Sequence, residues 1–412
     1  MKYGCIAEKL SHSFSKEIHS YLDSYPYELR EIAKGDLDAF MRQKDFIAIN
    51  VTIPYKQDVI PYLDEISDTA KSIGAVNTIV NRNGKLFGYN TDFFGMRSLI
   101  LSNNMSITGK KALVLGSGGT SKTAVAVLED LGAREIYKLS RRAQNGCITY
   151  DEALERHKDA EVIINTTPVG MYPNIGVSPI DISLFPKLSA VVDAVYNPLR
   201  TKLVSDALEK GIPAVGGLYM LVAQAARASE LFVDSKISEE KIVEVFKIMY
   251  KKTENIVLTG MPGAGKSTVG RLLAKALDMD FVDSDEEIIK KAGCSIPEIF
   301  SESGEDVFRD IESEVIKELS TRKNTVIATG GGVILRRENT DLLRENGRIY
   351  FLDRPLENIR PTSDRPTAFD REALEKRYRE RYDIYTSSCD VRVKTSEDAL
   401  ENTNKIIEDF KK

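Results

Sequence analysis

The sequence predicts an α/β protein in which parallel sheets are flanked by helices. Two segments indicate a strand, a glycine-rich turn and an amphipathic helix in that order: ALVLGSGGTSKTAVAVLEDLG from Ala112 and NIVLTGMPGAGKSTVGRLLAKALDM from Asn255. Short apolar runs of strand length follow the first segment at residues 135–139, 162–165, 191–195 and 212–215. Because strands that alternate with helices build parallel sheets, these observations favour the α/β class.

The second of these segments restarts the pattern, so we expect a new domain there. It is preceded by ISEEKIVEVFKIMYKKTEN, which looks helical and lacks the Gly, Ser or Pro enrichment of a long flexible linker. We place the boundary near Lys252, which gives domains at 1–252 and 253–412. A strand candidate at Phe46–Ile53 precedes the first segment. The first domain is therefore expected to hold an α/β substrate part, about 1–100 and 220–250, and a nucleotide-binding part, about 101–219.

The composition is that of a compact globular protein. The 412 residues are 42% hydrophobic and 29% charged, and the net charge of −5 offers no surplus positive field, so neither nucleic acid nor a membrane is an expected partner. The four cysteines lie far apart without a CxxC pair, which predicts reduced thiols and no zinc site. No segment reaches the roughly 18 apolar residues of a membrane span, and no signal-peptide pattern is present, so we expect a cytoplasmic protein. The oligomeric state stays open, with a homodimer among the options.

The second glycine-rich turn carries a specific phosphate-binding motif. Residues 260–267 read GMPGAGKS and fit GxxxxGK followed by Ser or Thr at every fixed position. Such a loop turns backbone amides toward the phosphates, while its lysine reaches the transferred phosphoryl group and its hydroxyl can bind Mg²⁺. The candidates for ATP binding are Gly263, Ala264, Gly265, Lys266, Ser267 and Thr268, with Ser267 also a candidate metal ligand.

Residues 254–412 resemble shikimate kinase. The resemblance rests on FVDSD at 281–285, GEDVFRDIE at 304–312, ATGGGV at 328–333 and RERYDIY at 379–385. It implies that Asp283 serves the Mg²⁺ site and that Asp285 faces the shikimate hydroxyls and is a candidate base. It further implies that Glu312 orients Arg309, and it assigns substrate binding to Arg309, Gly331, Gly332 and Arg381. The stretch RPTSDRPT from Arg360 resembles the mobile lid, with Arg365 as its catalytic arginine, although the near duplicate at Arg360 leaves that register open.

The first glycine-rich turn is a variant of the dinucleotide-binding fingerprint. It comprises Gly116, Ser117, Gly118, Gly119 and Thr120 and lies between the predicted strand and helix. The next strand ends at Ser140, Arg141 and Arg142, where proteins that prefer NAD place an acidic residue. Two arginines there favour the 2′-phosphate of NADP(H), and the alternative is a solvated basic turn.

Residues 1–250 resemble shikimate dehydrogenase. The motifs are LSHSFSKEIH at 10–19, NVTIPYK at 50–56, GAVNT at 74–78, YNTDFFG at 89–95, INTTPVGM at 164–171, DAVYNPLRT at 193–201 and GLYMLVAQAA at 217–226. The resemblance implies that Lys56 and Asp92 form the catalytic pair. It assigns substrate contacts to Ser13, Ser15, Thr52, Asn77, Tyr196 and Gln224, and it places Thr166, Thr167, Gly217 and Met220 near the cofactor. The histidines His12, His19 and His157 match no catalytic role and are expected to be structural or solvated.

We therefore expect a bifunctional enzyme. The first domain would reduce 3-dehydroshikimate reversibly to shikimate with NADPH, and the second would use MgATP to form shikimate 3-phosphate. One alternative is that the first domain prefers quinate and NAD, although Arg141 and Arg142 speak against NAD. Another is that one half is a ligand sensor that regulates the other, but a sensor would not need the predicted catalytic residues of both halves.

Overall fold

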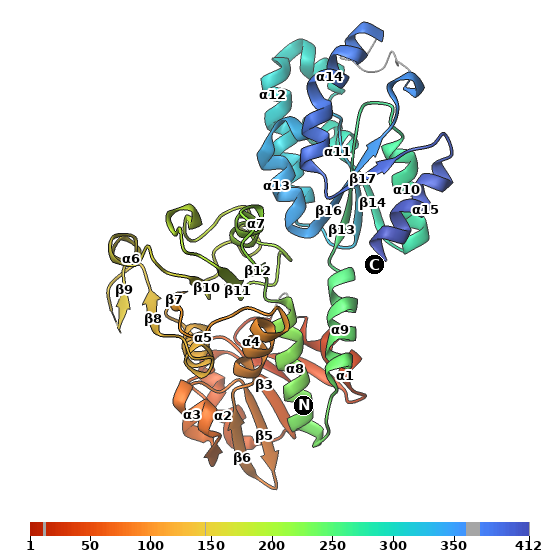
Figure 1. Cartoon of the computed structure of the whole chain (residues 1–412). Coiled ribbons are helices and arrows are strands. Elements are labelled where there is room, and N and C mark those ends of the chain that lie inside the picture. The colour runs from red at the N-terminus through yellow and green to blue at the C-terminus, as the bar shows by residue number, and fades with distance from the viewer. Residues whose placement is uncertain (11–13, 145, 360–370, 412) are drawn as a thin grey trace. The chain divides into compact units, whose positions relative to one another are not determined.

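The computed structural model describes residues 1–10, 14–144, 146–359 and 371–411 (Figure 1). Its chain contacts divide it into two compact units, Met1–Tyr250 and Lys251–Lys412, which we call unit 1 and unit 2. Each unit has its own sheets and its own hydrophobic core.

The first sheet of unit 1 is mixed and has the strand order β2-β1-β3-β5-β6-β4. Strand β1 is parallel to β2 and β3, whereas β5 is antiparallel to β3 and β6. Strand β3 lies inside this sheet, and all four of its residues are buried because elements cover both faces. The strands are β1 (Tyr3–Ala7), β2 (Tyr27–Glu31), β3 (Ala48–Val51), β4 (Glu65–Ile66), β5 (Thr78–Arg82) and β6 (Lys85–Tyr89), and the helices between them are α1 (Ser15–Leu22), α2 (Leu37–Gln43) and α3 (Asp68–Ile73).

The second sheet of unit 1 is wholly parallel, with the order β12-β11-β10-β7-β8-β9. The chain builds outward from β7 in one direction and then returns to build the other half from β10. This reversal creates a crevice beyond the carboxyl end of β7, which is where open α/β sheets bind ligands. The strands are β7 (Lys111–Leu115), β8 (Glu135–Leu139), β9 (Cys147–Ile148), β10 (Val162–Asn165), β11 (Ala190–Asp193) and β12 (Ala214–Val215), with α5 (Gly119–Asp130), α6 (Tyr150–Arg156) and α7 (Lys202–Glu209) between them.

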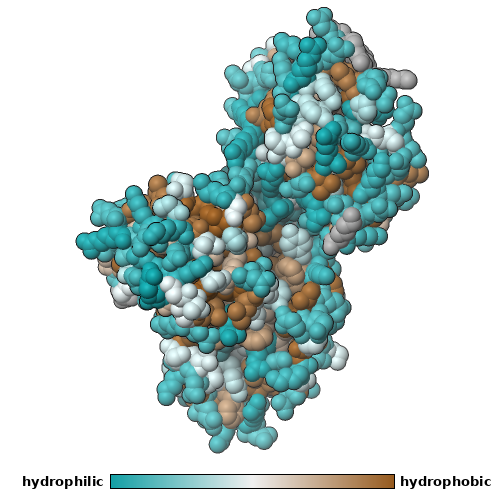
Figure 2. All heavy atoms as spheres, in the orientation of Figure 1, coloured by the Kyte–Doolittle hydropathy of each residue, from teal (hydrophilic) through white to brown (hydrophobic). Residues whose placement is uncertain are grey.

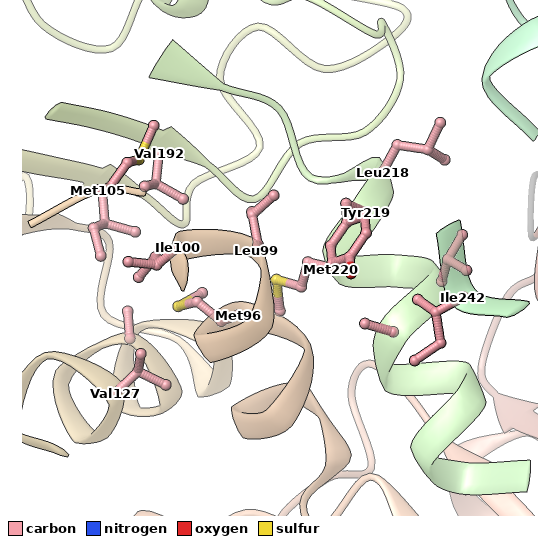
Figure 3. Packing of buried hydrophobic residues seen from close by; sticks show 14 of the residues in the cluster. Met96, Leu99, Ile100, Met105, Val127, Val192, Leu218, Tyr219, Met220 and Ile242 are labelled. Atoms are coloured by element: carbon pink, nitrogen blue, oxygen red, sulfur yellow. The ribbon is translucent and has the colours of Figure 1, made fainter. Parts of the chain in front are cut away.

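Three helices connect the two sheets of unit 1 through one apolar core: α4 (Thr91–Ser102), α8 (Leu218–Val233) and α9 (Glu239–Lys251). Figure 3 shows Met96, Leu99 and Ile100 of α4 lying among side chains of α5, β11 and α8. Helix α9 adds Ile242, Val245 and Met249 to the same core. Burial of this much apolar surface holds the site-bearing ends of the two sheets together.

Unit 2 has a single parallel sheet with the order β14-β15-β13-β16-β17. Successive residues of its central strand face opposite helical layers, so Ile256 and Leu258 pack with α10 and α15 while Val257 packs with α11, α12 and α13. The strands are β13 (Asn255–Thr259), β14 (Asp280–Asp283), β15 (Thr325–Ala328), β16 (Gly347–Asp353) and β17 (Val391–Lys394), and the helices are α10 (Lys266–Leu277), α11 (Ser284–Ala292), α12 (Ile296–Leu319), α13 (Arg337–Asn346), α14 (Arg371–Ser388) and α15 (Ala399–Phe410).

Some predicted strand ends differ from those observed. The apolar run 191–195 continues past the end of β11, because the Asp193 carboxylate accepts a hydrogen bond from the Val195 amide (3.0 Å) and turns the chain. The run 212–215 contributes only β12 at its end. The helical segment before unit 2 forms α9, from Glu239 to Lys251.

The surface of unit 1 is uneven in polarity. Figure 2 shows hydrophobic residues gathered around its middle on the visible face, while its two ends are mainly hydrophilic. Within the described ranges, no helix combines the length and the apolar character needed to cross a bilayer.

Candidate active sites

Unit 1 contains a cavity of about 460 Å³. Apolar and polar side chains both line it, and polar groups that converge on a concave site are what orient a small molecule. Ten of the residues predicted from the sequence line this one cavity, namely Ser15, Thr52, Lys56, Asn77, Asp92, Thr120, Tyr196, Gly217, Met220 and Gln224.

Lys56 and Asp92 form an ion pair at the cavity wall. The Nζ atom of Lys56 donates to Oδ2 of Asp92 at 2.5 Å, and the two side chains are 16% and 11% exposed. Asp92 lies in the first turn of α4, whose Asn90 cap accepts from the Phe93 amide (3.2 Å), so the helix dipole favours its negative charge. The pair thus offers an ammonium group that a neighbouring carboxylate holds in place at the cavity wall.

A close approach of two helices brings Asp92 to the cofactor side of the cavity. Gly95 of α4 permits it, because a Cβ atom there would lie only 2.6 Å from the Met220 carbonyl oxygen of α8. As a result, Asp92, Met220 and Gln224 line the same cavity although they come from two helices far apart in the sequence.

A chain of buried hydrogen bonds positions the polar residues beneath the cavity. The Oδ1 atom of Asn77 accepts from the Thr91 amide (2.7 Å), and Thr91 Oγ1 also lies 3.3 Å from Oε1 of Gln224. Asn50 donates from Nδ2 to Thr78 Oγ1 (3.1 Å) and accepts from Tyr27 (2.7 Å). With its oxygen already bonded, Asn77 presents its amide nitrogen as the group available to a ligand.

The dinucleotide loop follows β7 and leads into α5. Gly116 has φ +116°, and a Cβ atom there would lie 2.6 Å from Thr166 Oγ1, so this position requires glycine. A Cβ on Gly118 would meet nothing within 4 Å, and one on Gly119 would approach only Lys56 Cδ, at 3.8 Å. The loop therefore leaves open space beside Lys56. Thr166 lies against the loop, donating to the Leu115 carbonyl at 2.6 Å, and is not part of the cavity lining.

Gly217 at the start of α8, and Arg141 and Arg142 after β8, are further residues that the sequence assigns to the cofactor site of unit 1. A Cβ atom on Gly217 would lie 2.3 Å from the Ala194 carbonyl oxygen, so the start of α8 can pass here only as glycine. Arg141 and Arg142 are exposed, and neither forms an ion pair with any described residue. Ser140 is buried and bonds to the Arg142 backbone, which shapes the turn. The open glycine loop and two free guanidinium groups fit a phosphorylated dinucleotide.

The phosphate loop of unit 2 lies between β13 and α10, at the centre of the sheet. Gly260, Gly263 and Gly265 all have positive φ (146°, 84° and 96°), which only glycine adopts without strain. Lys266 donates to the carbonyl oxygens of Gly260 (2.8 Å) and Met261 (3.1 Å), so its ammonium group is held over the loop. This arrangement can bind the phosphates of a nucleotide.

Two carboxylates follow β14 beside the loop. Asp283 accepts from Ser267 Oγ at 2.6 Å through one oxygen and from the Asp285 amide at 3.0 Å through the other. A hydroxyl and a carboxylate are the oxygen donors that Mg²⁺ uses when phosphates and water supply its other ligands, so the set fits this ion. Asp285 points elsewhere, since its Oδ1 atom would lie 2.5 Å from a Cβ on Gly330.

The opposite side of the unit 2 site is built on buried arginines. Arg309 donates to Glu312 (2.7 Å) and Glu305 (3.0 Å), and its guanidinium group lies against Gly332. Burial lowers the pKa of Arg309, but the carboxylates of Glu312 and Glu305 together outweigh that effect and raise it. Arg381 donates to the Gly331 carbonyl at 2.9 Å. Burial raises the pKa of Glu312 despite the neighbouring Arg309.

Several residues of these sites were not singled out from the sequence. Asn50 and Lys9 line the cavity of unit 1. In unit 2 the Tyr385 hydroxyl donates to the carbonyl oxygens of both Gly260 (3.1 Å) and Gly331 (2.5 Å), which ties the phosphate loop to the triple-glycine turn. Asn50 and Tyr385 occur within the motifs NVTIPYK and RERYDIY, and that position was the only signal for them. Ser13, His12, Arg360 and Arg365 lie outside the described residues.

These features define the class of each unit. Unit 1 has a doubly wound parallel sheet, and its glycine loop opens beside the Lys56 and Asp92 pair. This combination is that of an oxidoreductase that uses a dinucleotide. In unit 2 the central strand of a parallel sheet leads into a phosphate loop, and the Ser267 hydroxyl and the Asp283 carboxylate are placed for Mg²⁺. This combination is that of a phosphotransferase.

Comparisons with known proteins agree with both classes. Residues 5–79 match the family model of the shikimate dehydrogenase substrate binding domain, and residues 262–411 match that of shikimate kinase. The NADP(+) shikimate dehydrogenase of Clostridium beijerinckii is 37% identical over 261 residues, which are 60% of this chain and 97% of that protein. The chain therefore belongs to the shikimate dehydrogenase family, carries a shikimate kinase domain after it, and is a bifunctional enzyme of the shikimate pathway.

Solved structures give the same result for unit 1. A chorismate mutase/shikimate 5-dehydrogenase fusion protein from Clostridium acetobutylicum has 38% identity and a TM-score of 0.57, covering 61% of this chain and 97% of that one. The shikimate 5-dehydrogenase of Thermus thermophilus, solved in complex with NADP(H) and shikimate, has 28% identity and a TM-score of 0.55, covering 60% of this chain and 99% of that one.

Proposed function

We propose that unit 1 reduces 3-dehydroshikimate reversibly to shikimate with NADPH, and that unit 2 transfers a phosphoryl group from MgATP to shikimate to give shikimate 3-phosphate. For unit 1 the proposal rests on one observation: a single cavity is lined by the Lys56 and Asp92 pair, by Thr120 of the dinucleotide loop, and by Gly217 and Met220 of α8. Bound NADPH would supply the hydride.

In unit 1 we assign proton transfer to Lys56. A ketone oxygen beside Nζ would take the proton of the ammonium group as it gains negative charge, and in the reverse direction the amine would accept the hydroxyl proton. Asp92, at 2.5 Å, holds the ammonium group in place. We assign substrate contacts to Ser15, Thr52, Asn77, Tyr196 and Gln224, whose hydroxyl and amide groups suit a polyhydroxylated ring acid.

The cofactor preference follows from the turn after β8. We assign the 2′-phosphate of NADP(H) to Arg141 and Arg142, which are exposed and have no ion-pair partner among the described residues. Activity with NADPH should therefore exceed activity with NADH. The double variant Arg141→Ala, Arg142→Ala should lower the ratio of NADPH activity to NADH activity, because it removes both contacts that we assign to the 2′-phosphate. Equal use of both cofactors by the unmodified protein would instead favour the NAD-linked alternative.

In unit 2 we assign the phosphates of ATP to the phosphate loop with Lys266, and Mg²⁺ to Ser267 and Asp283. The metal would neutralise charge on the transferred phosphoryl group. Asp285 would orient the attacking hydroxyl, while Arg309, Arg381 and the Gly331–Gly332 backbone would hold the substrate. The hydrogen bonds of Asp283, at the end of β14, with Ser267 at the start of α10 and with the Asp285 amide carry this part of the proposal.

The decisive test is a coupled assay on the purified full chain. With 3-dehydroshikimate and NADPH we expect NADPH oxidation, and on addition of MgATP we expect shikimate 3-phosphate. NADPH oxidation without phosphorylation would overturn the assignment of unit 2, and absence of both would overturn the substrate class. With shikimate supplied directly to the kinase reaction, Lys56→Ala should abolish only NADPH oxidation and Lys266→Ala should abolish only phosphorylation, whereas a regulatory half would affect the other activity.

We also propose a cytoplasmic location. The four cysteines, all within the described residues, are free. This state supports a reducing compartment, because thiols persist there. Fractionation of the source cells, with the coupled assay as the readout, tests this location.

A further inference from the structure

Among the described residues that line the unit 1 cavity, three carry a charge: Lys9, Lys56 and Asp92. Lys56 and Asp92 neutralise each other at 2.5 Å. Lys9 therefore leaves the wall with one net positive charge. The proposed substrate is a ring acid with a carboxylate, so this charge has the sign that such a ligand needs.

Lys9 lies in the segment between β1 and α1, which also gives Leu10 and Ser15 to the cavity wall. The Leu10 amide donates to Oε1 of Glu31 on β2 at 2.8 Å, and this bond ties the segment to the sheet. The Lys9 side chain is exposed and forms no ion pair with any described residue, although Glu8 and Glu31 are acidic neighbours. A lysine fixed in this way at the backbone, with an uncommitted ammonium group, can bind a ligand anion without first breaking an ion pair.

We propose that Lys9 binds the carboxylate of the ring acid and thereby selects anionic over neutral ring substrates. The inference rests on the proposed function of unit 1. The reacting oxygen of the substrate belongs beside Lys56 and Asp92, and the carboxylate is attached to a different ring carbon, so it faces another part of the wall. Lys9 is a binding residue in this account and takes no part in proton transfer.

The test compares Lys9→Gln and Lys9→Arg in the full chain, with NADPH oxidation as the readout. Loss of a charged hydrogen bond at a partly exposed site should raise KM for 3-dehydroshikimate about tenfold in Lys9→Gln and change kcat less than about twofold. Lys9→Arg should keep KM near that of the unmodified protein. Lys71→Gln, which removes an exposed lysine of α3 outside the cavity, is the matched control, and the thermal melting transition of unit 1 in each variant reports on folding.

The methyl ester of 3-dehydroshikimate separates charge recognition from a change of shape. Because the ester has no negative charge, its KM should be the same for Lys9→Gln and for the unmodified protein. An unchanged KM for the acid in Lys9→Gln, or an equal rise for acid and ester, would overturn the inference. An unmodified protein that does not oxidise NADPH with 3-dehydroshikimate would instead overturn the proposed function, and the inference with it.

Discussion

Lys56 and Asp92 show how the fold pairs two side chains that the sequence separates by 36 positions. Lys56 follows β3 in the first sheet, and its carbonyl oxygen accepts from the Val76 amide at 2.8 Å, which fixes its backbone. Asp92 lies in the first turn of α4, the helix whose apolar residues pack against α8. The carboxylate therefore keeps its position relative to the ammonium group through burial of the helix that carries it.

Replacing Lys56 by Met should remove proton transfer while keeping much of the side-chain volume. We expect kcat for NADPH oxidation to fall about 100-fold or more, because general acid catalysis contributes about this much. A melting transition of unit 1 close to that of the unmodified protein serves as the control for folding, and the kinase reaction with added shikimate should be unaffected. Asp92→Asn should also lower kcat, since it removes the charge that holds the ammonium group. A Lys56→Met variant with near-normal kcat would contradict the assignment.

His19 carries a different consequence, for stability at acid pH. It is 1% exposed, it stacks on Tyr27 with ring centroids 4.0 Å apart, and its Nδ1 atom lies 2.6 Å from the Tyr25 hydroxyl. Burial lowers the pKa of His19 to about 3, whereas an unfolded histidine titrates near about 6.5. Between these two values the unfolded chain binds the additional proton, so His19 stabilises unit 1 above pH ~6.5 and this contribution is lost as the pH falls toward ~3.

His19→Phe should therefore make the stability of unit 1 less sensitive to acid. Calorimetric melting between pH ~7 and pH ~4 should show a smaller fall in the unit 1 transition for the variant than for the unmodified protein. His157→Phe is the comparison, because burial also lowers the pKa of His157 but its ring is less enclosed, so its effect should be smaller. An equal acid dependence with and without His19 would disprove the argument.

At the scale of elements, both glycine loops and their flanking strands and helices could be predicted from periodicity and turn residues alone. The buried hydrogen-bond chain could not, because Asn50, Thr78, Thr91 and Gln224 come from β3, β5, α4 and α8 and meet only after the sheet and helices pack. The role of Tyr385 could not be predicted for a similar reason, since its hydroxyl bonds to Gly260 and Gly331, which both lie more than fifty residues away in the sequence. Spacing in a sequence reveals local structure, whereas these contacts depend on tertiary packing.

The glycines of unit 1 predict two different effects of adding a methyl group. Gly217→Ala should lower the melting temperature, because the new Cβ would lie 2.3 Å from a backbone oxygen that cannot move easily. Gly118→Ala should leave the melting temperature nearly unchanged, since its Cβ would meet nothing within 4 Å and its φ of −81° suits alanine.

The same Gly118→Ala variant should nevertheless raise KM for NADPH several-fold, because its methyl group would occupy open space beside the loop, and glycine loops of this kind hold the pyrophosphate there. Thermal melting and NADPH kinetics on both variants test these expectations together. A destabilised Gly118→Ala variant would contradict the geometry of the dinucleotide loop, and a Gly217→Ala variant of normal stability would contradict the close approach of α8 to Ala194.

At the scale of the whole molecule, the chain consists of two compact units, and the chain passes from one to the other at the end of α9. Helix α9 gives Ile242, Val245 and Met249 to the core of unit 1. Its last residue, Lys251, belongs instead with unit 2, where it pairs with Glu254 (3.4 Å) and lies over the Phe410 ring at 4.0 Å. The expected boundary after Lys252 and the division of contacts before Lys251 therefore differ in where they place two residues, Lys251 and Lys252.

We predict that fragments 1–252 and 251–412 each fold and retain their own activity. Fragment 253–412 should melt at a somewhat lower temperature than 251–412, because it lacks the contacts of Lys251 with Glu254 and Phe410. Fragment 1–238 should be much less stable than 1–252, since removal of α9 exposes the apolar core of unit 1. Melting curves and the two enzyme assays on each fragment measure these effects, and inactive halves would contradict the prediction of two independent folding units.

Carrying both units on one continuous chain has a consequence for how the two activities can vary in a cell. Every copy that is synthesised brings one site of each kind, so changes in gene expression or in degradation of the chain multiply both capacities by the same factor. The ratio of reduction to phosphorylation then depends on substitutions inside one unit and on the supply of NADPH, ATP and the two acid substrates. Natural selection on that ratio would act on residues such as Lys9 or Tyr385 rather than on the amount of protein.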